Sequence, residues 1–346
     1  MTGGHAQAAS PKRELVATIN SNVNFFYPGR GTTAEEYNFG MLVFNGLVGI
    51  APDLTLRPEL AESWTSNEAA TEWTFHLRRG VTFHNGKPFT AGDVVHTFKL
   101  LADPELASRA RSTAEMIDRI DTPDEHTAIF VLKEPYGAWP SMLIERQLKI
   151  VPEGVSLEEM AKHPVGTGPF VFEPYTPGDR VVVRKNPNYW EAGLPKLDRV
   201  TLRIMPEDAA KIAALKAGDV DVLWNVPLES IKALEAEPDI IVDAKATGTW
   251  DGIVMNNTQK PFDDVRVRQA LNMAINKERI VRIINNRAVP ANQVLPPLFE
   301  AHDPSYEGYP YDPERARQLL AEAGYPNGFD TVLYAYNVAP NDRIAQ

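Results

Sequence analysis

The chain has 346 residues, which exceeds the length at which one hydrophobic core usually keeps growing, so two or more domains are expected. Its 35 Lys and Arg are outnumbered by 46 Asp and Glu, and the formal net charge of −11 disfavours nucleic acid or an anionic membrane as a partner. The absence of cysteine excludes disulfides, thiolate metal ligands and thiol catalysis. Since no run of about 18 apolar residues occurs, we expect no direct membrane insertion.

The N-terminal residues 1–13 are expected to be a disordered or tag-like extension. Met1–Ser10 lacks the apolar stretch of a signal peptide, so we expect the signal peptide to be absent from this chain. Ala6-Gln7-Ala8 nevertheless has the small-x-small form of a processed export site, and a cloning remnant is the alternative interpretation.

The first predicted strand, Glu14–Ile19, alternates apolar and polar residues and is rich in β-branched side chains. The polar stretch Asn20–Asn24 follows its carboxyl end, and in open α/β sheets that end faces the ligand crevice. Apolar residues at helical spacing then predict a helix over Tyr37–Val48. This order indicates an α/β fold.

Residues 49–165 are predicted to form a small subdomain inserted into the first lobe. Glu72–Arg78 and Thr127–Leu132 alternate as half-buried strands do. Thr90-Ala91-Gly92-Asp93 has the spacing of a capping box and predicts the start of a helix. Lobe I is expected to comprise residues 14–48 and 166–245.

The remaining residues, 246–346, are assigned to lobe II. Before it, Pro206–Ala217 is a predicted amphipathic helix, and Val220–Trp224 a strand. Trp250–Met255 is predicted to be the strand that carries the chain into lobe II, and Val265–Ile284 to be one long helix.

Three groups of motifs resemble the extracellular solute-binding family that serves peptide and nickel ABC transporters. The motifs are Pro58–Trp64, Trp73–Gly86 and Phe89–Val94 in the first group, Gly166–Phe170 and Asn186–Trp190 in the second, and Asn256–Thr258 and Pro261–Leu271 in the third. Their order and spacing extend the resemblance over residues 14–346.

The resemblance implies a type II-like periplasmic binding protein with two lobes of mixed sheets and an extra small subdomain. It implies a periplasmic, monomeric, non-enzymatic component of an ABC importer, which captures a peptide or similar small polar solute by lobe closure and delivers it to membrane permease subunits. No cofactor is implied. Family members continue beyond this length, so the resemblance also predicts a second lobe that is incomplete at its C-terminus.

Eight residues are predicted to contact the ligand. They are Asn20, Ser21, Asn24, Phe26, Arg111, Arg146, Trp250 and Asp251. The first four follow the first strand, and the last two lie where the chain crosses between lobes. The two arginines are implied by the resemblance, because nickel-chelate members use arginines from this stretch. Loop packing or surface solvation is the alternative for each.

Catalytic interpretations find little support in the sequence. Gly166-Thr167-Gly168-Pro169 lacks the Lys-Ser/Thr ending of a phosphate loop and is interpreted as a structural turn. The seven histidines show neither metal-ligand spacing nor an HExxH motif, and no GxSxG elbow occurs. A binder of a metal chelate, opine or oligosaccharide is the first alternative, and a hydrolase or an interaction module are the others.

Overall fold

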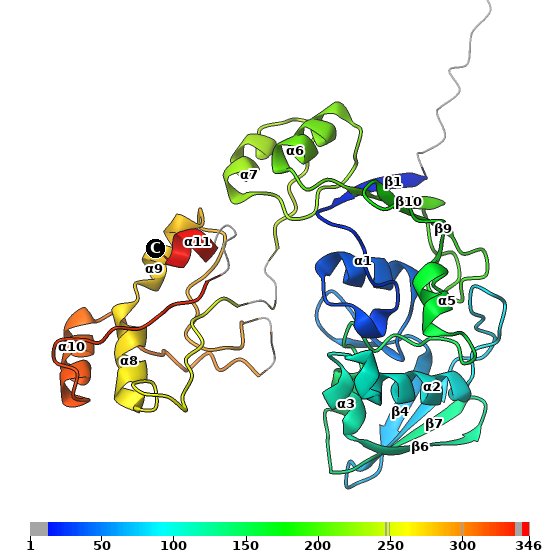
Figure 1. Ribbon diagram of the computed structural model, residues 1–346, viewed down its shortest axis with the longest axis horizontal. Helices are drawn as coiled ribbons and strands as arrows, with labels where there is room; N and C mark the ends of the chain where they lie inside the picture. The colour runs from blue at the N-terminus through cyan, green and yellow to red at the C-terminus, as the bar shows by residue number, and fades with distance from the viewer. Residues whose placement is uncertain are drawn as a thin grey trace, which may run out of the picture. The chain divides into compact units, whose positions relative to one another are not determined.

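The computed structural model describes residues 13–245, 248, 250–297, 299, 301–335 and 341–345. The chain divides into two compact units, Met1–Asn225 and Val226–Gln346 (Figure 1). The sequence analysis placed the boundary after residue 245. In the structure, residues 226–245 belong to the second unit. The predicted N-terminal extension lies outside the described residues, except for its last residue.

The first sheet of unit 1 has four strands in the order β1-β10-β9-β8. They are β1 (Glu14–Ile19), β8 (Phe170–Phe172), β9 (Arg180–Lys185) and β10 (Arg199–Ile204). β1 is parallel to β10 and the other pairs are antiparallel, which makes this a mixed sheet, as expected. One residue in two along β9 and β10 is buried, so one face of the sheet covers the core.

The edge of β1 is partly covered by the segment before Asn225. α6 (Asp208–Ala217) ends at Gly218, whose φ of 77° suits a glycine C-cap, as the sequence predicted. The strand predicted over Val220–Trp224 is reduced to one parallel bridge between Ala17 and Val222, with the Thr18 amide donating to Val222 O over 3.0 Å.

The second four-stranded sheet of unit 1 is antiparallel, in the order β4-β5-β7-β6. Its strands are β4 (Ala61–Ser66), β5 (Glu72–Leu77), β6 (Ile117–Asp124) and β7 (Thr127–Leu132). α2 (Ala91–Ala102) packs on this sheet, and the Phe130 ring lies 5.2 Å from Phe75 and 5.1 Å from Phe98, centroid to centroid. These apolar rings fix the sheet to the helix.

Shorter elements complete unit 1. They are η1 (Pro28–Arg30), α1 (Ala34–Val43), β2 (Val48–Ile50), β3 (Leu56–Pro58), η2 (Pro104–Leu106), α3 (Arg111–Glu115), α4 (Trp139–Met142) and α5 (Leu157–Lys162). In Figure 1, α1 and α5 lie between the two four-stranded sheets. The helix predicted over Tyr37–Val48 begins earlier because Thr33 and Glu36 form a capping box, and it ends earlier because Val48 pairs with Pro58 in β2 and β3.

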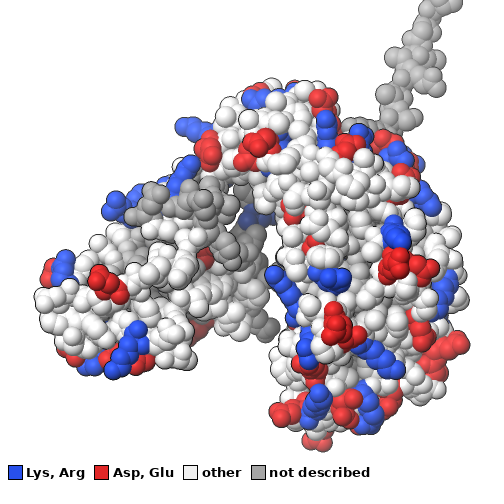
Figure 2. Space-filling model, viewed as in Figure 1, with Lys and Arg blue, Asp and Glu red and all other residues white. Residues whose placement is uncertain are grey.

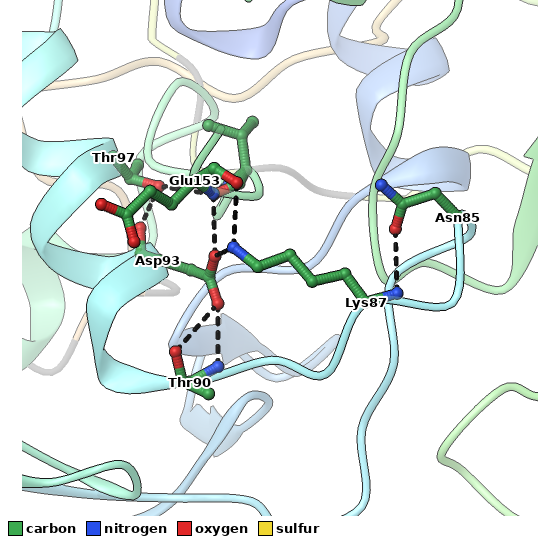
Figure 3. A network of polar contacts seen from close by, with 7 residues as sticks. Asn85, Lys87, Thr90, Asp93, Thr97 and Glu153 are labelled. Carbon is green, nitrogen blue, oxygen red and sulfur yellow. Dashed lines mark hydrogen bonds and ion pairs between the residues drawn. The ribbon is translucent and has the colours of Figure 1, made fainter. Parts of the chain in front are cut away.

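An ion pair between the buried Asp93 and the half-buried Lys87 holds the start of α2 (Figure 3). Asp93 is fully buried, and its Oδ1 lies 2.7 Å from Lys87 Nζ and accepts the Glu153 amide over 2.8 Å. Its Oδ2 accepts the Thr90 amide over 2.8 Å, which completes the predicted capping box. One carboxylate thus joins the turn before α2 to the segment around residue 153.

Three backbone segments meet at the turn predicted over Gly166–Pro169. A Cβ at Gly166 would lie 2.1 Å from Val43 O, and one at Gly168 would lie 2.4 Å from the Val43 carbonyl carbon. His84 Nε2 lies 3.0 Å from Gly168 O, and His84 Nδ1 lies 3.4 Å from the Gly166 amide nitrogen. Only glycine permits this close approach.

Among the described residues of unit 2, all regular elements are helices, and the rest of these residues have no regular structure. The helices are α7 (Leu228–Glu235), α8 (Val265–Ala274), α9 (Lys277–Ile283), α10 (Pro313–Glu322) and α11 (Asn341–Ala345). α8 packs on α10 through Ala270, Ala316 and Leu319.

Two predictions for unit 2 are wrong. Residues Trp250–Met255 form no strand, because no described segment pairs with them. The single helix predicted over Val265–Ile284 is two helices. The first ends at Ala274, where Ile275 becomes extended, and Asn276 caps the second by accepting the Arg279 amide.

Candidate functional site

The loop after β1 begins at Asn20, which is fixed on both sides. Its amide donates to Glu35 Oε1 over 3.3 Å, and its Oδ1 accepts from Lys211 Nζ over 2.7 Å. The Lys211 side chain is 4% exposed and also pairs with Asp208 at 2.7 Å. Asn20 therefore joins the carboxyl end of the strand to α1 and α6.

The middle of this loop presents two polar side chains to the surface. Ser21 and Asn24 are exposed, and neither side chain hydrogen-bonds to another residue that the structure describes. Between them, Asn22 Oδ1 accepts the Tyr175 hydroxyl over 2.8 Å and the Gly178 amide over 2.9 Å. Asn22 anchors the loop, and Ser21 and Asn24 are left with donors and acceptors available to a ligand.

The carboxylate of Glu36, which is 3% exposed, closes the loop from inside. Its Oε1 accepts the Phe25 amide over 3.2 Å, and its Oε2 accepts the Thr32 and Thr33 amides over 2.7 Å and 3.0 Å. Three amides on one buried carboxylate form a strong, directional anchor. The sequence analysis missed Glu36, although Thr33-x-x-Glu36 is a capping-box pattern that could have indicated it.

Phe26 turns inward from the same loop. Its ring lies 4.9 Å from Phe39, 4.9 Å from Phe172 and 5.2 Å from Tyr175, centroid to centroid, and the residue is 7% exposed. The ring therefore packs in the core of unit 1 and offers a ligand very little surface. Next to it, burial raises the pKa of Tyr27, whose hydroxyl has no hydrogen-bond partner among the described residues.

Arg146 is connected to this loop through Tyr37. Its guanidinium lies 4.9 Å from the centroid of the Tyr37 ring, and Arg146 is exposed. The Tyr37 hydroxyl donates to Gly31 O over 3.1 Å, and Gln147 Nε2 donates to the Tyr37 hydroxyl over 2.7 Å. A cation stacked on an aromatic ring keeps its remaining N–H donors free for an anion.

Arg111 has a partner within its own helix. Its guanidinium lies 2.7 Å from Glu115 Oε1 as an i,i+4 pair on α3. Thr113 Oγ1 donates to Glu145 Oε1 over 2.9 Å, which attaches α3 to the segment that carries Arg146. The structure thus connects Arg146 through Tyr37 to Gly31, seven residues after Asn24, places Arg111 on α3, and places the two remaining candidates in unit 2.

Trp250 and Asp251, those remaining candidates, are both on the surface of unit 2. Trp250 is 40% exposed and Asp251 is exposed, in a stretch without regular structure. A Cβ at Gly252 would lie 2.0 Å from indole Cζ3, so the ring lies over a backbone position that glycine leaves open.

Trp224 is a further aromatic residue that the sequence analysis did not select as a candidate. Its side chain is 47% exposed, and it lies two residues after Val222, which pairs in parallel with Ala17. Asn20 lies three residues after Ala17, so both segments continue towards the same edge of the sheet. Its place inside a predicted strand hid this signal.

The described residues contain no group of three or more His, Asp or Glu arranged to hold a metal ion. Among the same residues, no helix is both long and apolar enough to cross a membrane. The candidate side chains of unit 1 are polar, basic or aromatic, and most follow strand ends. Such side chains can hydrogen-bond to, ion-pair with and stack on a small solute.

The chain belongs to the bacterial extracellular solute-binding proteins, family 5, whose middle region matches residues 55–346. It is 33% identical over 347 residues to the glutathione-binding protein GsiB of Escherichia coli strain K12, covering 99% of this chain and 67% of that protein. Solute binding is therefore its function, as the resemblance implied.

Solved structures agree with this assignment and with the type II fold. The periplasmic binding protein DppA from Helicobacter pylori, in complex with the peptide STSA, is 28% identical, has a TM-score of 0.78, and is matched over 91% of this chain and 67% of its own. HbpA2 from Haemophilus parasuis is 26% identical, has a TM-score of 0.80, and is matched over 96% of this chain and 72% of its own.

Proposed function

We propose that this protein captures a short peptide or peptide-like solute in the periplasm and delivers it to the permease of an ABC importer without changing it chemically. The observation that carries the peptide assignment is the agreement of two relatives. One is named for glutathione, itself a peptide, and the other contains a bound peptide.

The candidate loop has groups that suit such a solute. A peptide offers alternating amide donors and carbonyl acceptors, and the exposed side chains of Ser21 and Asn24 can each donate and accept hydrogen bonds. The guanidinium of Arg146 suits a terminal carboxylate. Trp224 supplies an exposed apolar ring against which a side chain of the solute can pack.

The experiment is native mass spectrometry of the purified protein, followed by release and sequencing of any retained compound. We expect a noncovalent peptide-sized adduct that is recovered intact. Glutathione and the tetrapeptide STSA are then titrated by calorimetry, and saturable binding without a product is the expected result. Hydrolysis of either compound, or saturable binding of a sugar with no binding of peptides, would contradict the proposal.

A matched pair of variants tests the loop itself. Ser21→Ala with Asn24→Ala should weaken binding about tenfold, since each change removes a hydrogen bond worth about 0.5–1.5 kcal/mol. The control is Ser66→Ala, which removes an exposed hydroxyl from the edge strand β4 of the other sheet. Equal effects of the double variant and the control would exclude the loop from the solute site.

A further inference from the structure

The exposed face of β9 and β10 carries four arginines in two directly opposed pairs. Arg180 faces Arg203 across the antiparallel ladder, and Arg184 faces Arg199. The residues that alternate with them along both strands are buried in the core, so the arginines stand on the outer face. We call this set the arginine face.

This arrangement opposes the stability of the sheet. Like charges directly opposite each other in an antiparallel pair are destabilising, and here two such pairs occur only four residues apart. Composition does not explain the cluster either, because the chain carries a net charge of −11. An unfavourable arrangement that the fold itself does not need points to a functional role.

Two of the four arginines are neutralised locally. Arg180 Nε lies 2.7 Å from Asp179 Oδ2, and Arg199 lies 2.7 Å from Glu173 Oε2. These carboxylates reduce the repulsion, and they also place negative charge beside the arginine face. Figure 2 shows basic and acidic side chains mixed over the part of unit 1 that contains β1, β9 and β10.

The other two arginines keep their donors free. Arg184 and Arg203 are exposed, and neither makes an ion pair or a side-chain hydrogen bond with a described residue. They occupy diagonal corners of the arginine face. Arg184 lies on β9 at one end of the ladder, opposite Arg199, and Arg203 lies on β10 at the other end, opposite Arg180. Four residues along a strand span about 13 Å, so the two free guanidiniums emerge from backbone positions roughly 14 Å apart.

We propose that the arginine face binds an acidic segment of a partner protein, whose carboxylates bind Arg184 and Arg203. A guanidinium presents paired N–H donors that match the two oxygens of a carboxylate. Acidic side chains on an extended segment can reach both corners while avoiding Asp179 and Glu173. A uniformly anionic lipid surface would also meet those two carboxylates, so the mixed charge favours a partner with discrete acidic groups.

The arginine face and the solute loop use different side chains but meet at one end of the sheet, where Arg203 pairs with Thr18 and the Gly178 amide donates to Asn22 Oδ1. β10 lies between β1 and β9 in the sheet, and the solute loop follows β1. Titrating the Arg184→Thr/Arg203→Thr variant with glutathione and STSA keeps the two proposals apart: unchanged solute affinity with lost peptide binding is the expected result, and failure of the solute assignment does not bear on the arginine face.

The test uses the full chain and a fluorescent hexaglutamate peptide, whose extended length of about 20 Å spans both corners. Binding is measured by anisotropy at low salt, where attraction between exposed charges is weakly screened. The double variant Arg184→Thr/Arg203→Thr should bind at least tenfold more weakly. The control Arg79→Thr/Arg109→Thr removes the same charge from exposed positions of unit 1 outside this sheet and should change the affinity less than threefold.

Thermal unfolding supplies the second readout. Removing the opposed charges should leave Tm unchanged or raise it, because each deleted arginine faces another arginine. A lower Tm for the double variant would overturn the proposal, since the arginines would then stabilise the sheet. It would also be overturned by equal losses of affinity in the control, or by binding to phosphatidylglycerol vesicles without binding to the peptide.

Discussion

His84 should make unit 1 sensitive to acid. Burial is the largest effect and lowers the pKa of its imidazole from 6.5 to about 4. The hydrogen bond to Gly168 opposes this shift, and repulsion from Arg184, the smallest of the three effects, adds to it. The neutral ring suits this position, because Nε2–H donates to Gly168 O while Nδ1 accepts the Gly166 amide. A second ring proton would face that amide.

The sign follows from the two pKa values. The unfolded chain takes up this proton below pH 6.5, whereas the folded chain takes it up only near pH 4. The stability associated with neutral His84 is therefore complete above pH 6.5 and is lost as the pH falls towards 4. At about 1.4 kcal/mol per pH unit, the loss approaches 3 kcal/mol.

Urea unfolding of the native protein and of His84→Gln between pH 7.5 and pH 4.5 measures this effect. Gln can still donate to Gly168 O but cannot titrate, so other titrating groups largely cancel in the difference between the two proteins. At pH 7.5 the variant should be about 1 kcal/mol less stable, because the Gly166 amide loses its acceptor. Below pH 6 the difference should shrink and then reverse, and a difference that is constant with pH would refute the reasoning.

Three further predictions concern packing, charge and the solute. Gly168→Ala should lower stability by roughly 3 kcal/mol, because its Cβ would lie 2.4 Å from a backbone carbon, whereas Gly137→Ala, with no atom within 4 Å, should have little effect in the same urea assay. Asp93→Asn should lower the free energy of unfolding by about 2 kcal/mol, because Lys87 loses its charged partner. Adding Lys87→Met should recover part of this loss, and additive losses in a double-mutant cycle would contradict the prediction. Trp250→Ala should weaken solute binding measured by calorimetry and remove the contribution of Trp250 to any ligand-induced fluorescence change. Because Trp250 is 40% exposed, Tm should be nearly unchanged. A large decrease in Tm with normal binding would assign Trp250 to packing.

Local patterns predicted the elements whose signal lies within the element itself. β1 and β7 have the predicted bounds. In β7 the alternating apolar residues match alternating burial in a sheet with one buried face, whereas in β1 burial increases from Glu14 to Ile19 without alternating. α2 begins after Thr90 because the capping box is a local arrangement of side chain and backbone. These elements come from unit 1, where each finds a partner to pack against.

Predictions failed where the outcome depends on a distant partner. Trp250–Met255 has the composition of a strand, but a strand requires a neighbouring strand, and no described segment supplies one. The exposed polar residues after β1, by contrast, could be selected from the sequence, because a general rule places polar side chains at strand ends near a ligand. The burial of Phe26 and the anchoring by Glu36 depend on α1 and β8, which the sequence does not place in space.

Equilibrium dialysis of the protein against labelled glutathione and labelled STSA, with chemical analysis of the solute afterwards, tests solute capture most directly. The account predicts saturable binding of at least one peptide, with all of the solute recovered unchanged. Recovery of a cleaved or modified solute, or the absence of saturable binding of any peptide, would contradict it.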